Sequence, residues 1–258
     1  MNRIDKLFQT KRKGILSVYT TAGFPRLNDT LPVIRALEAG GADMVEIGIP
    51  FSDPMADGPT IQQSSSRAIK SGMTLPLLFE QLAGIRRSIG IPLILMGYLN
   101  PVMQYGIENF CRRCAETGID GVIVPDLPFD DYLRDYKPLA DRYGLRFVML
   151  ITPATSDERI RLIDRHTGGF IYMVSTASTT GAQPSFPPET IRYFERIDAL
   201  GLKNPRLVGF GISNPDTFGT ALDHASGAII GSEFIKILSE TTDPQKSVNQ
   251  LLKNIGVE

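Results

Sequence analysis

The sequence predicts an α/β protein in which residues 1–258 form one (β/α)8 barrel with an extra helix at the N-terminus. Short runs rich in β-branched residues alternate with longer amphipathic segments, a pattern typical of βα units and a parallel sheet. Eight such runs occur, and 258 residues is a suitable length for one barrel. An open doubly wound sheet is disfavoured because no G-x-G-x-x-G motif follows the first run. The predicted architecture is therefore the TIM barrel.

Strands and helices are expected to alternate along the whole chain. The expected strands begin near Gly14, Asp43, Ile91, Asp120, Leu145, Gly169, Arg206 and Gly227. The expected helices between them cover residues 31–39, 75–89, 107–116, 132–142, 157–165, 188–200 and 215–223. Capping residues precede several of these helices, as at residues 28–30 and 213–215, and glycine follows others, as at Gly118 and Gly144.

The charge balance argues against a basic surface of the kind that binds nucleic acid. The net charge is -1, with 27 basic and 28 acidic residues, and the one short basic block is residues 11–13. The first residues lack the apolar core of a signal peptide, and no apolar run approaches the roughly 18 residues that a membrane span requires. We therefore expect a cytoplasmic protein with neither a nucleic acid nor a membrane as its partner.

Two cysteines, Cys111 and Cys114, form a C-x-x-C motif. They lie inside an expected helix, whereas a redox pair is expected to open a helix after a strand. The histidines, His166 and His224, are isolated in sequence. We therefore interpret the cysteines as two ordinary helix thiols and expect no metal site.

Two loops are longer than a βα unit requires. One follows the second strand over residues 49–59, and the other covers residues 175–184 after the sixth strand. All βα loops of a barrel lie at its C-terminal face, so both loops are expected to border one pocket. The second loop consists mainly of small and polar residues and contains a glycine, which suggests a mobile lid.

Three carboxylates belong to the second strand and its loop. Glu46 lies inside an apolar strand, where acid–base chemistry is favoured, although a structural acid paired with a buried base is an alternative. Asp53 and Asp57 share a loop pinned by prolines, and the sequence leaves open which of them faces the pocket. Either one could instead be a turn or cap acid. Asp126, after the fourth strand, is interpreted as a loop hydrogen-bonding residue.

Glycines follow the seventh and eighth strands, at residues 208–213 and 229–234. A short helix beginning at Ser232 would direct its positive end toward the pocket, and glycines let backbone N–H groups approach a ligand closely. These features predict a phosphate site of the kind common in barrels, although single glycines could merely ease turns. Gly181 could add a contact.

The residues also limit the chemistry. No lysine ends a strand where it could form a Schiff base, and no metal cluster is expected, so carboxylates must transfer the protons alone. Such a site requires a substrate that carries its own electron sink. An aromatic slot beside the carboxylates could be lined by Tyr19, Ile61, Tyr172 and Phe210, each of which could instead be ordinary core.

From end to end, the chain resembles the tryptophan synthase alpha subunit family. The most specific match is EIGIPFSDPMADGPTIQ over residues 46–62, supported by GFGIS over 209–213, by Gly231 and Ser232, and by the Tyr172 to Gly181 segment. The resemblance implies a retro-aldol cleavage of indole-3-glycerol phosphate to indole and glyceraldehyde 3-phosphate without a cofactor. It also implies a beta-subunit partner in an α2β2 complex, in which pyridoxal phosphate belongs to the beta subunit alone.

The resemblance also implies roles for individual residues. Glu46 would protonate indole C3 and help to remove the proton of the glycerol hydroxyl, while Asp57 would stabilise charge at the indole nitrogen. Tyr172 and Phe210 would wall the indole slot. The lid would close through Thr180 and Gly181, and the phosphate would be held by Gly181, Gly211, Gly231 and Ser232.

Some positions depart from the family pattern. Ser178 and Thr179 stand where the family usually has glycine and an aliphatic residue, so the resemblance leaves the stiffness of the lid, and hence its closure rate, open. Tyr19 stands where phenylalanine is frequent, and Phe24 follows the glycine after the first strand. Two alternative functions remain at this point: a stand-alone lyase that releases indole, and a weakly active module that mainly activates a beta subunit.

Overall fold

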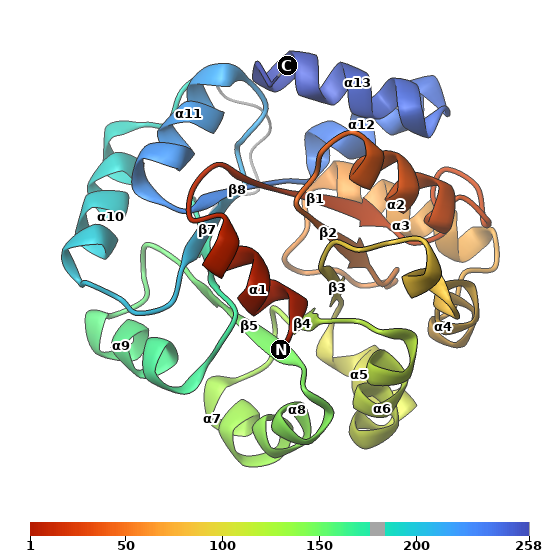
Figure 1. Ribbon diagram of the computed structural model, residues 1–258, viewed down its shortest axis with the longest axis horizontal. Helices are drawn as coiled ribbons and strands as arrows, with labels where there is room; N and C mark the ends of the chain where they lie inside the picture. The colour runs from red at the N-terminus through yellow and green to blue at the C-terminus, as the bar shows by residue number, and fades with distance from the viewer. Residues whose placement is uncertain (176–183, 258) are drawn as a thin grey trace.

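The predicted barrel is confirmed by the computed structural model, which describes residues 1–175 and 184–257. Its parallel strands close in sequence order from β1 to β8 (Figure 1). The strands are β1 Ile15–Thr21, β2 Met44–Gly48, β3 Leu93–Met96, β4 Gly121–Ile123, β5 Arg146–Ile151, β6 Ile171–Val174, β7 Arg206–Gly209 and β8 Gly227–Ile230. Most strand residues are buried because the barrel interior covers one face and helices cover the other.

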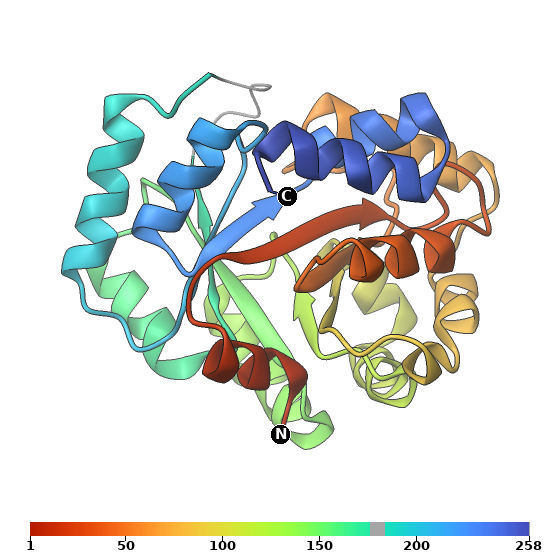
Figure 2. The same ribbon diagram turned by 45° about the horizontal axis from the view of Figure 1, so that its top comes forward.

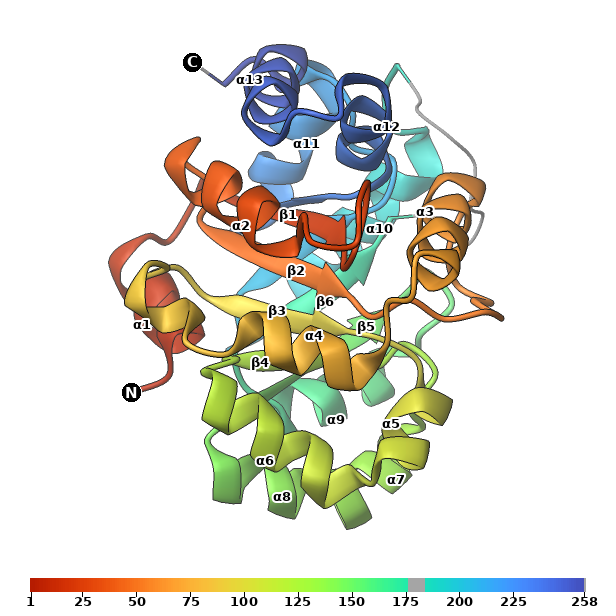
Figure 3. The ribbon, with the colours of Figure 1, turned by 90° about the vertical axis from the view of Figure 1, so that its right-hand side faces the viewer.

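The helices surround the barrel (Figures 1 and 3). They are α1 Arg3–Thr10, α2 Thr30–Ala39, α3 Pro59–Lys70, α4 Leu75–Leu82, α5 Leu99–Tyr105, α6 Ile107–Thr117, α7 Phe129–Asp131, α8 Lys137–Tyr143, α9 Asp157–His166, α10 Pro188–Ala199, α11 Pro215–His224, α12 Ser232–Thr241 and α13 Pro244–Ile255. A 3₁₀ turn, η1 (Ile85–Arg87), follows α4, and a π-helical turn, η2 (Tyr132–Tyr136), precedes α8. Among the described residues no helix is both long and apolar enough to cross a membrane.

The helices differ from the prediction at several places. The chain forms α3, α5 and α13 where no helix was predicted. The helix predicted over 75–89 ends at Leu82, because Gly84 adopts a left-handed conformation with φ 74° before η1 begins. The helix predicted over 132–142 begins as the π-helical turn η2. Of these differences, α3 matters most for the site, because it directly follows the loop that carries Asp57.

The predicted N-terminal helix, α1, lies across the N-terminal end of the barrel (Figure 2). Ile4 is fully buried there, and a Cβ atom added to Gly121 at the start of β4 would lie 2.8 Å from the Ile4 side chain. Asp5 pairs with Arg146 at 2.6 Å, and the Asn2 side-chain amide donates to the Asp120 carbonyl at 2.8 Å. The helix therefore closes the end of the barrel opposite to the predicted pocket.

We expect Ile4→Ala to lower the free energy of unfolding by about 2–5 kcal/mol, because a buried side chain is removed from a site that surrounding strands cannot refill. Ile69→Ala is the matched control, because Ile69 on α3 is 38% exposed and its truncation should change the free energy by less than about 0.5 kcal/mol. Urea unfolding followed by circular dichroism measures both values. Equal effects of the two substitutions would contradict a closing role for α1.

Candidate active site

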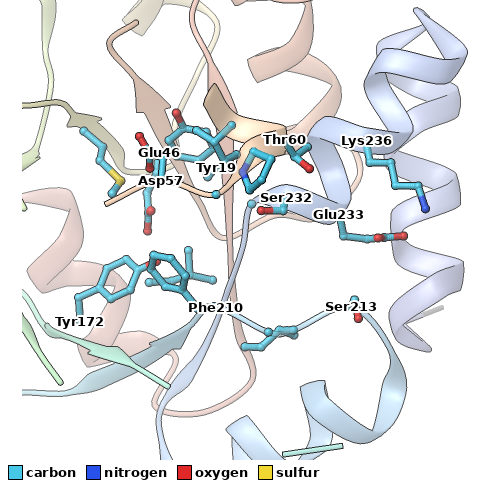
Figure 4. A pocket seen from close by; sticks show the side chains of 18 residues that line it. Tyr19, Glu46, Asp57, Thr60, Tyr172, Phe210, Ser213, Ser232, Glu233 and Lys236 are labelled. Atoms are coloured by element: carbon cyan, nitrogen blue, oxygen red, sulfur yellow. The ribbon is translucent and has the colours of Figure 1, made fainter. Parts of the chain in front are cut away.

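A cavity of about 410 Å³ lies at the C-terminal ends of the strands (Figure 4). The predicted site residues that line it are Tyr19, Glu46, Asp57, Ile61, Tyr172, Phe210, Gly211, Gly231 and Ser232. Thr180 and Gly181 lie outside the described residues, as do Ser178 and Thr179 of the predicted lid. The chain thus brings side chains from β1, β2, β6 and the loops after β2, β7 and β8 to one cavity.

Glu46 occupies the middle of β2 and is fully buried. Its Oε1 atom accepts a hydrogen bond from Ser17 Oγ at 3.0 Å, and its Oε2 atom has no hydrogen-bond partner within the described ranges. Burial raises the pKa of Glu46 to about 8, and the Ser17 bond offsets part of this increase. No Lys or Arg pairs with Glu46 among the described residues, so the alternative of a structural ion pair receives no support. A carboxyl with this pKa is largely protonated at neutral pH.

Asp57 approaches the same cavity from the loop between β2 and α3. Its Oδ2 atom accepts a hydrogen bond from the Tyr98 hydroxyl at 2.9 Å, and that hydroxyl accepts one from the Ala56 N–H at 2.9 Å. Gln62 donates to the Asp57 carbonyl at 2.8 Å. Burial raises the pKa of Asp57, and the Tyr98 bond lowers it. Tyr98 therefore fixes both the loop and the carboxylate, a contact between residues too distant in sequence to be predicted.

The question left open between the two loop aspartates is settled by geometry. Asp53 is exposed, does not line the cavity, and accepts a hydrogen bond from the neighbouring Ser52 hydroxyl. Asp126 accepts a hydrogen bond from the Leu99 N–H at 2.8 Å, as interpreted from the sequence. Asp57 is therefore the loop carboxylate that can meet a ligand in the cavity.

The predicted aromatic slot is formed beside the carboxylates. Tyr172 and Phe210 meet edge to face with ring centroids 6.2 Å apart. Phe210 has a φ of 72°, a left-handed conformation that costs a non-glycine residue on the order of 1 kcal/mol. Such strain is commonly found where a side chain is held in a functional position, and here it accompanies a ring that lines the cavity.

Two glycines make room for the tyrosines of the slot. A Cβ atom added to Gly48 would lie 2.0 Å from the Tyr19 hydroxyl, and one added to Gly209 would lie 2.2 Å from the Tyr172 hydroxyl. Both positions therefore exclude every larger residue while the tyrosines keep their places. Burial raises the pKa of both phenols, which consequently remain neutral.

The other end of the cavity suits an anion. Gly211 has a φ of 73°, and Gly231 directly precedes α12, whose first turn receives no side-chain capping bond from its N-cap residue, Gly231. Ser232 and Lys236, one helical turn apart on α12, line this end together with Ser213 (Figure 4). Glu233 also lines it and accepts a hydrogen bond from Asn254 at 3.0 Å.

Sequence reasoning missed several lining residues. The lining residues that were not among its candidate site residues are Gly58, Pro59, Thr60, Met96, Ile212, Ser213, Ile229, Glu233 and Lys236. Lys236 could have been found, because residues four apart in a helix share a face and Ser232 was already a candidate. Met96 ends β3 and gave no signal that distinguished it from the other apolar residues of its strand.

The cysteines lie apart from this cavity. Cys111 and Cys114 lie in the helix α6, as predicted; both are buried, and burial raises the pKa of the Cys111 thiol to about 11. A thiol with so high a pKa is a poor nucleophile at neutral pH. Over residues 1–175 and 184–257, no group of three or more His, Cys, Asp or Glu side chains could hold a metal ion.

Comparisons with known proteins agree with this geometry. The family model described as tryptophan synthase alpha chain matches residues 5–257. Tryptophan synthase alpha chains of Parabacteroides distasonis and Phocaeicola vulgatus are 61% and 60% identical to this chain, with 98% of each chain covered. The Legionella pneumophila alpha subunit superposes with a TM-score of 0.87 at 35% identity, covering 99% of this chain and 97% of that one. The chain belongs to the tryptophan synthase alpha chain family.

Proposed function

We propose that the chain is a carbon–carbon lyase that cleaves indole-3-glycerol phosphate to indole and glyceraldehyde 3-phosphate, the alpha reaction of tryptophan biosynthesis. The observation that carries this proposal is the pair of carboxyl groups, Glu46 and Asp57, held in different settings on one cavity. Pairs of carboxyl groups with different environments can divide acid and base roles. The slot beside them suits an indole, and the anion end suits the phosphate.

The first step is a proton transfer to the indole ring. Glu46 is protonated at neutral pH, so its Oε2 atom can give a proton to indole C3. The positive charge that results is shared with the indole nitrogen, whose N–H can donate to the Asp57 carboxylate. A cationic ring provides the electron sink for carbon–carbon cleavage, so the reaction requires neither a metal nor a cofactor of this chain.

The second step breaks the carbon–carbon bond. The Glu46 carboxylate, having lost its proton, takes one from the glycerol hydroxyl on the carbon attached to C3. The O–H electron pair forms the aldehyde carbonyl, and the electrons of the broken bond return to the ring and neutralise it. Glu46 thereby recovers its proton, and Asp57 remains a carboxylate throughout.

The phosphate is assigned to the other end of the cavity. Gly211 and Gly231 let the backbone approach the phosphate closely. Ser232 begins α12, whose N-terminal end is positive, and Lys236 adds positive charge. We include Thr180 and Gly181 of the lid in this assignment on the family resemblance alone.

The partner is assigned from the family. The relative from Mycobacterium tuberculosis, 26% identical with a TM-score of 0.86, is described as a tryptophan synthase. We propose a beta-subunit partner in an α2β2 complex, with pyridoxal phosphate confined to the beta subunit. We assign this contact to the loop that carries Asp53 and Met55. The Met55 side chain is 84% exposed. A cytoplasmic location remains a prediction.

Indole formation from indole-3-glycerol phosphate, assayed with and without a beta chain, tests the proposal. Glu46→Gln should lower kcat by about 10²–10⁴ because the general acid is lost, with KM and beta-chain binding retained. Circular dichroism checks that the variant folds. Near-normal turnover of the variant would remove Glu46 from its role, and strong activity without a beta chain would favour the stand-alone lyase.

The stability of the wild type relative to Glu46→Gln should depend on pH. The folded pKa of about 8 exceeds the unfolded value of 4.5, so the native state keeps a proton that the unfolded state releases. The wild type should therefore lose about 1.4 kcal/mol relative to the variant for each pH unit between these values. Urea unfolding at several pH values measures the difference, and a constant difference would show that Glu46 titrates normally.

Gly211→Asp should raise KM roughly 10- to 100-fold with a smaller effect on kcat, because a carboxylate would repel the substrate phosphate. Gly211→Ala is the matched control, since it carries the same strain at a φ of 73° without the charge. Steady-state kinetics and inhibition by inorganic phosphate measure the effect. If the two variants behaved alike, the phosphate would have to bind elsewhere.

A further inference from the structure

A buried hydroxyl on the neighbouring strand contacts Glu46. Ser17 on β1 is fully buried, and its Oγ atom donates to Glu46 Oε1 at 3.0 Å. In the strand register Ser17 lies opposite Met44 and Tyr19 lies opposite Glu46, so Ser17 is the diagonal neighbour of Glu46 on the same face. The second carboxyl oxygen, Oε2, is buried and has no partner in the described part of the chain.

We propose that Ser17 is a positioning residue that makes Glu46 act through a single oxygen. Ser17 occupies Oε1, and Oε2 carries the proton that reaches indole C3 and later receives the proton of the glycerol hydroxyl. This inference rests on the proposed lyase function and adds to it the identity of the reacting oxygen.

Carboxyl chemistry supports this assignment. A protonated carboxyl has one oxygen that accepts hydrogen bonds and one that carries the proton. A hydroxyl that donates to Oε1 therefore leaves the proton on Oε2. Leaving a buried oxygen without a partner is unfavourable. Glu46 lines the cavity and Thr20, whose hydroxyl is also unpartnered, does not, so Glu46 Oε2 is the unpartnered oxygen that a substrate can reach.

The other groups near Glu46 do not replace Ser17. Tyr19 on β1 and Tyr172 on β6 face the same cavity as neutral phenols, and Asp57 enters it from the loop after β2. Glu233 and Lys236 line the far end. Ser17 is thus the one hydrogen-bond donor to Glu46 among the residues that the structure describes, and its bond favours the ionised form.

The pH dependence of indole formation tests the proposal. We expect Ser17→Ala to lower kcat about tenfold, keep KM within about twofold, and move the alkaline limb of kcat upward by about one pH unit, because a donor to the carboxylate is lost. Ser17→Thr keeps a hydroxyl and should retain the wild-type limb. Ser17→Val matches threonine in shape without the hydroxyl, so this pair repeats the test if the alanine variant does not fold.

Thr20→Val is the control for losing a buried hydroxyl from β1. Thr20 is 1% exposed, and its hydroxyl has no partner among the described residues, so its loss should leave the pH profile unchanged. If the alkaline limb of kcat moved to lower pH in Ser17→Ala, the proposal would be overturned, because Ser17 would then accept the Glu46 proton. If the limb of this variant stayed in place, the proposal would also be overturned, because Ser17 would then only fill space. If the wild type formed no indole, the proposed function itself would fail, which is a distinct outcome.

Discussion

Burial of one carboxyl group inside the barrel is the constraint on which the rest of the site depends. An ionised carboxylate at the Glu46 position would lose most of its hydration, and no described basic residue pairs with it, so the group remains protonated to about pH 8. This state lowers stability at high pH, and it is the state that the proposed role of general acid at neutral pH requires. The β1 and β2 strands hold the acid rigidly, because both are buried on both faces.

The second carboxyl group, Asp57, lies in a loop, where a hydrogen bond can support its charged form. The role proposed for Asp57 requires a charged carboxylate, and the Tyr98 hydroxyl supports the charged form while burial opposes it. Tyr98 lies between β3 and α5, so one βα unit positions the Asp57 loop of the preceding unit. Because all parallel strands of a barrel end at the same face, such contacts between successive loops are built into the architecture.

The repeat of strands and the buried position of Glu46 could be predicted because both depend on local patterns of apolar residues. The local pattern could not choose between Asp53 and Asp57, which only the family resemblance separated, since the choice depends on Tyr98, 41 residues from Asp57 in sequence. Ser17 looked like any small polar residue in a strand until the register placed it beside Glu46. The helix α3 was missed because its polar residues 62–66 resemble a loop, although Ile61 and Ala68 bury one face. Tertiary contacts decided each of these cases.

The protonation state of Glu46 is the central claim, and it can be observed directly. Infrared difference spectra of wild type minus Glu46→Gln, recorded from pH 5 to pH 10, isolate the carboxyl band of this one side chain. A protonated carboxyl band that persists at pH 7 and disappears with a midpoint near pH 8 is the predicted result. Absence of the protonated band throughout this range, as the ordinary glutamate pKa of about 4.3 requires, would contradict the account.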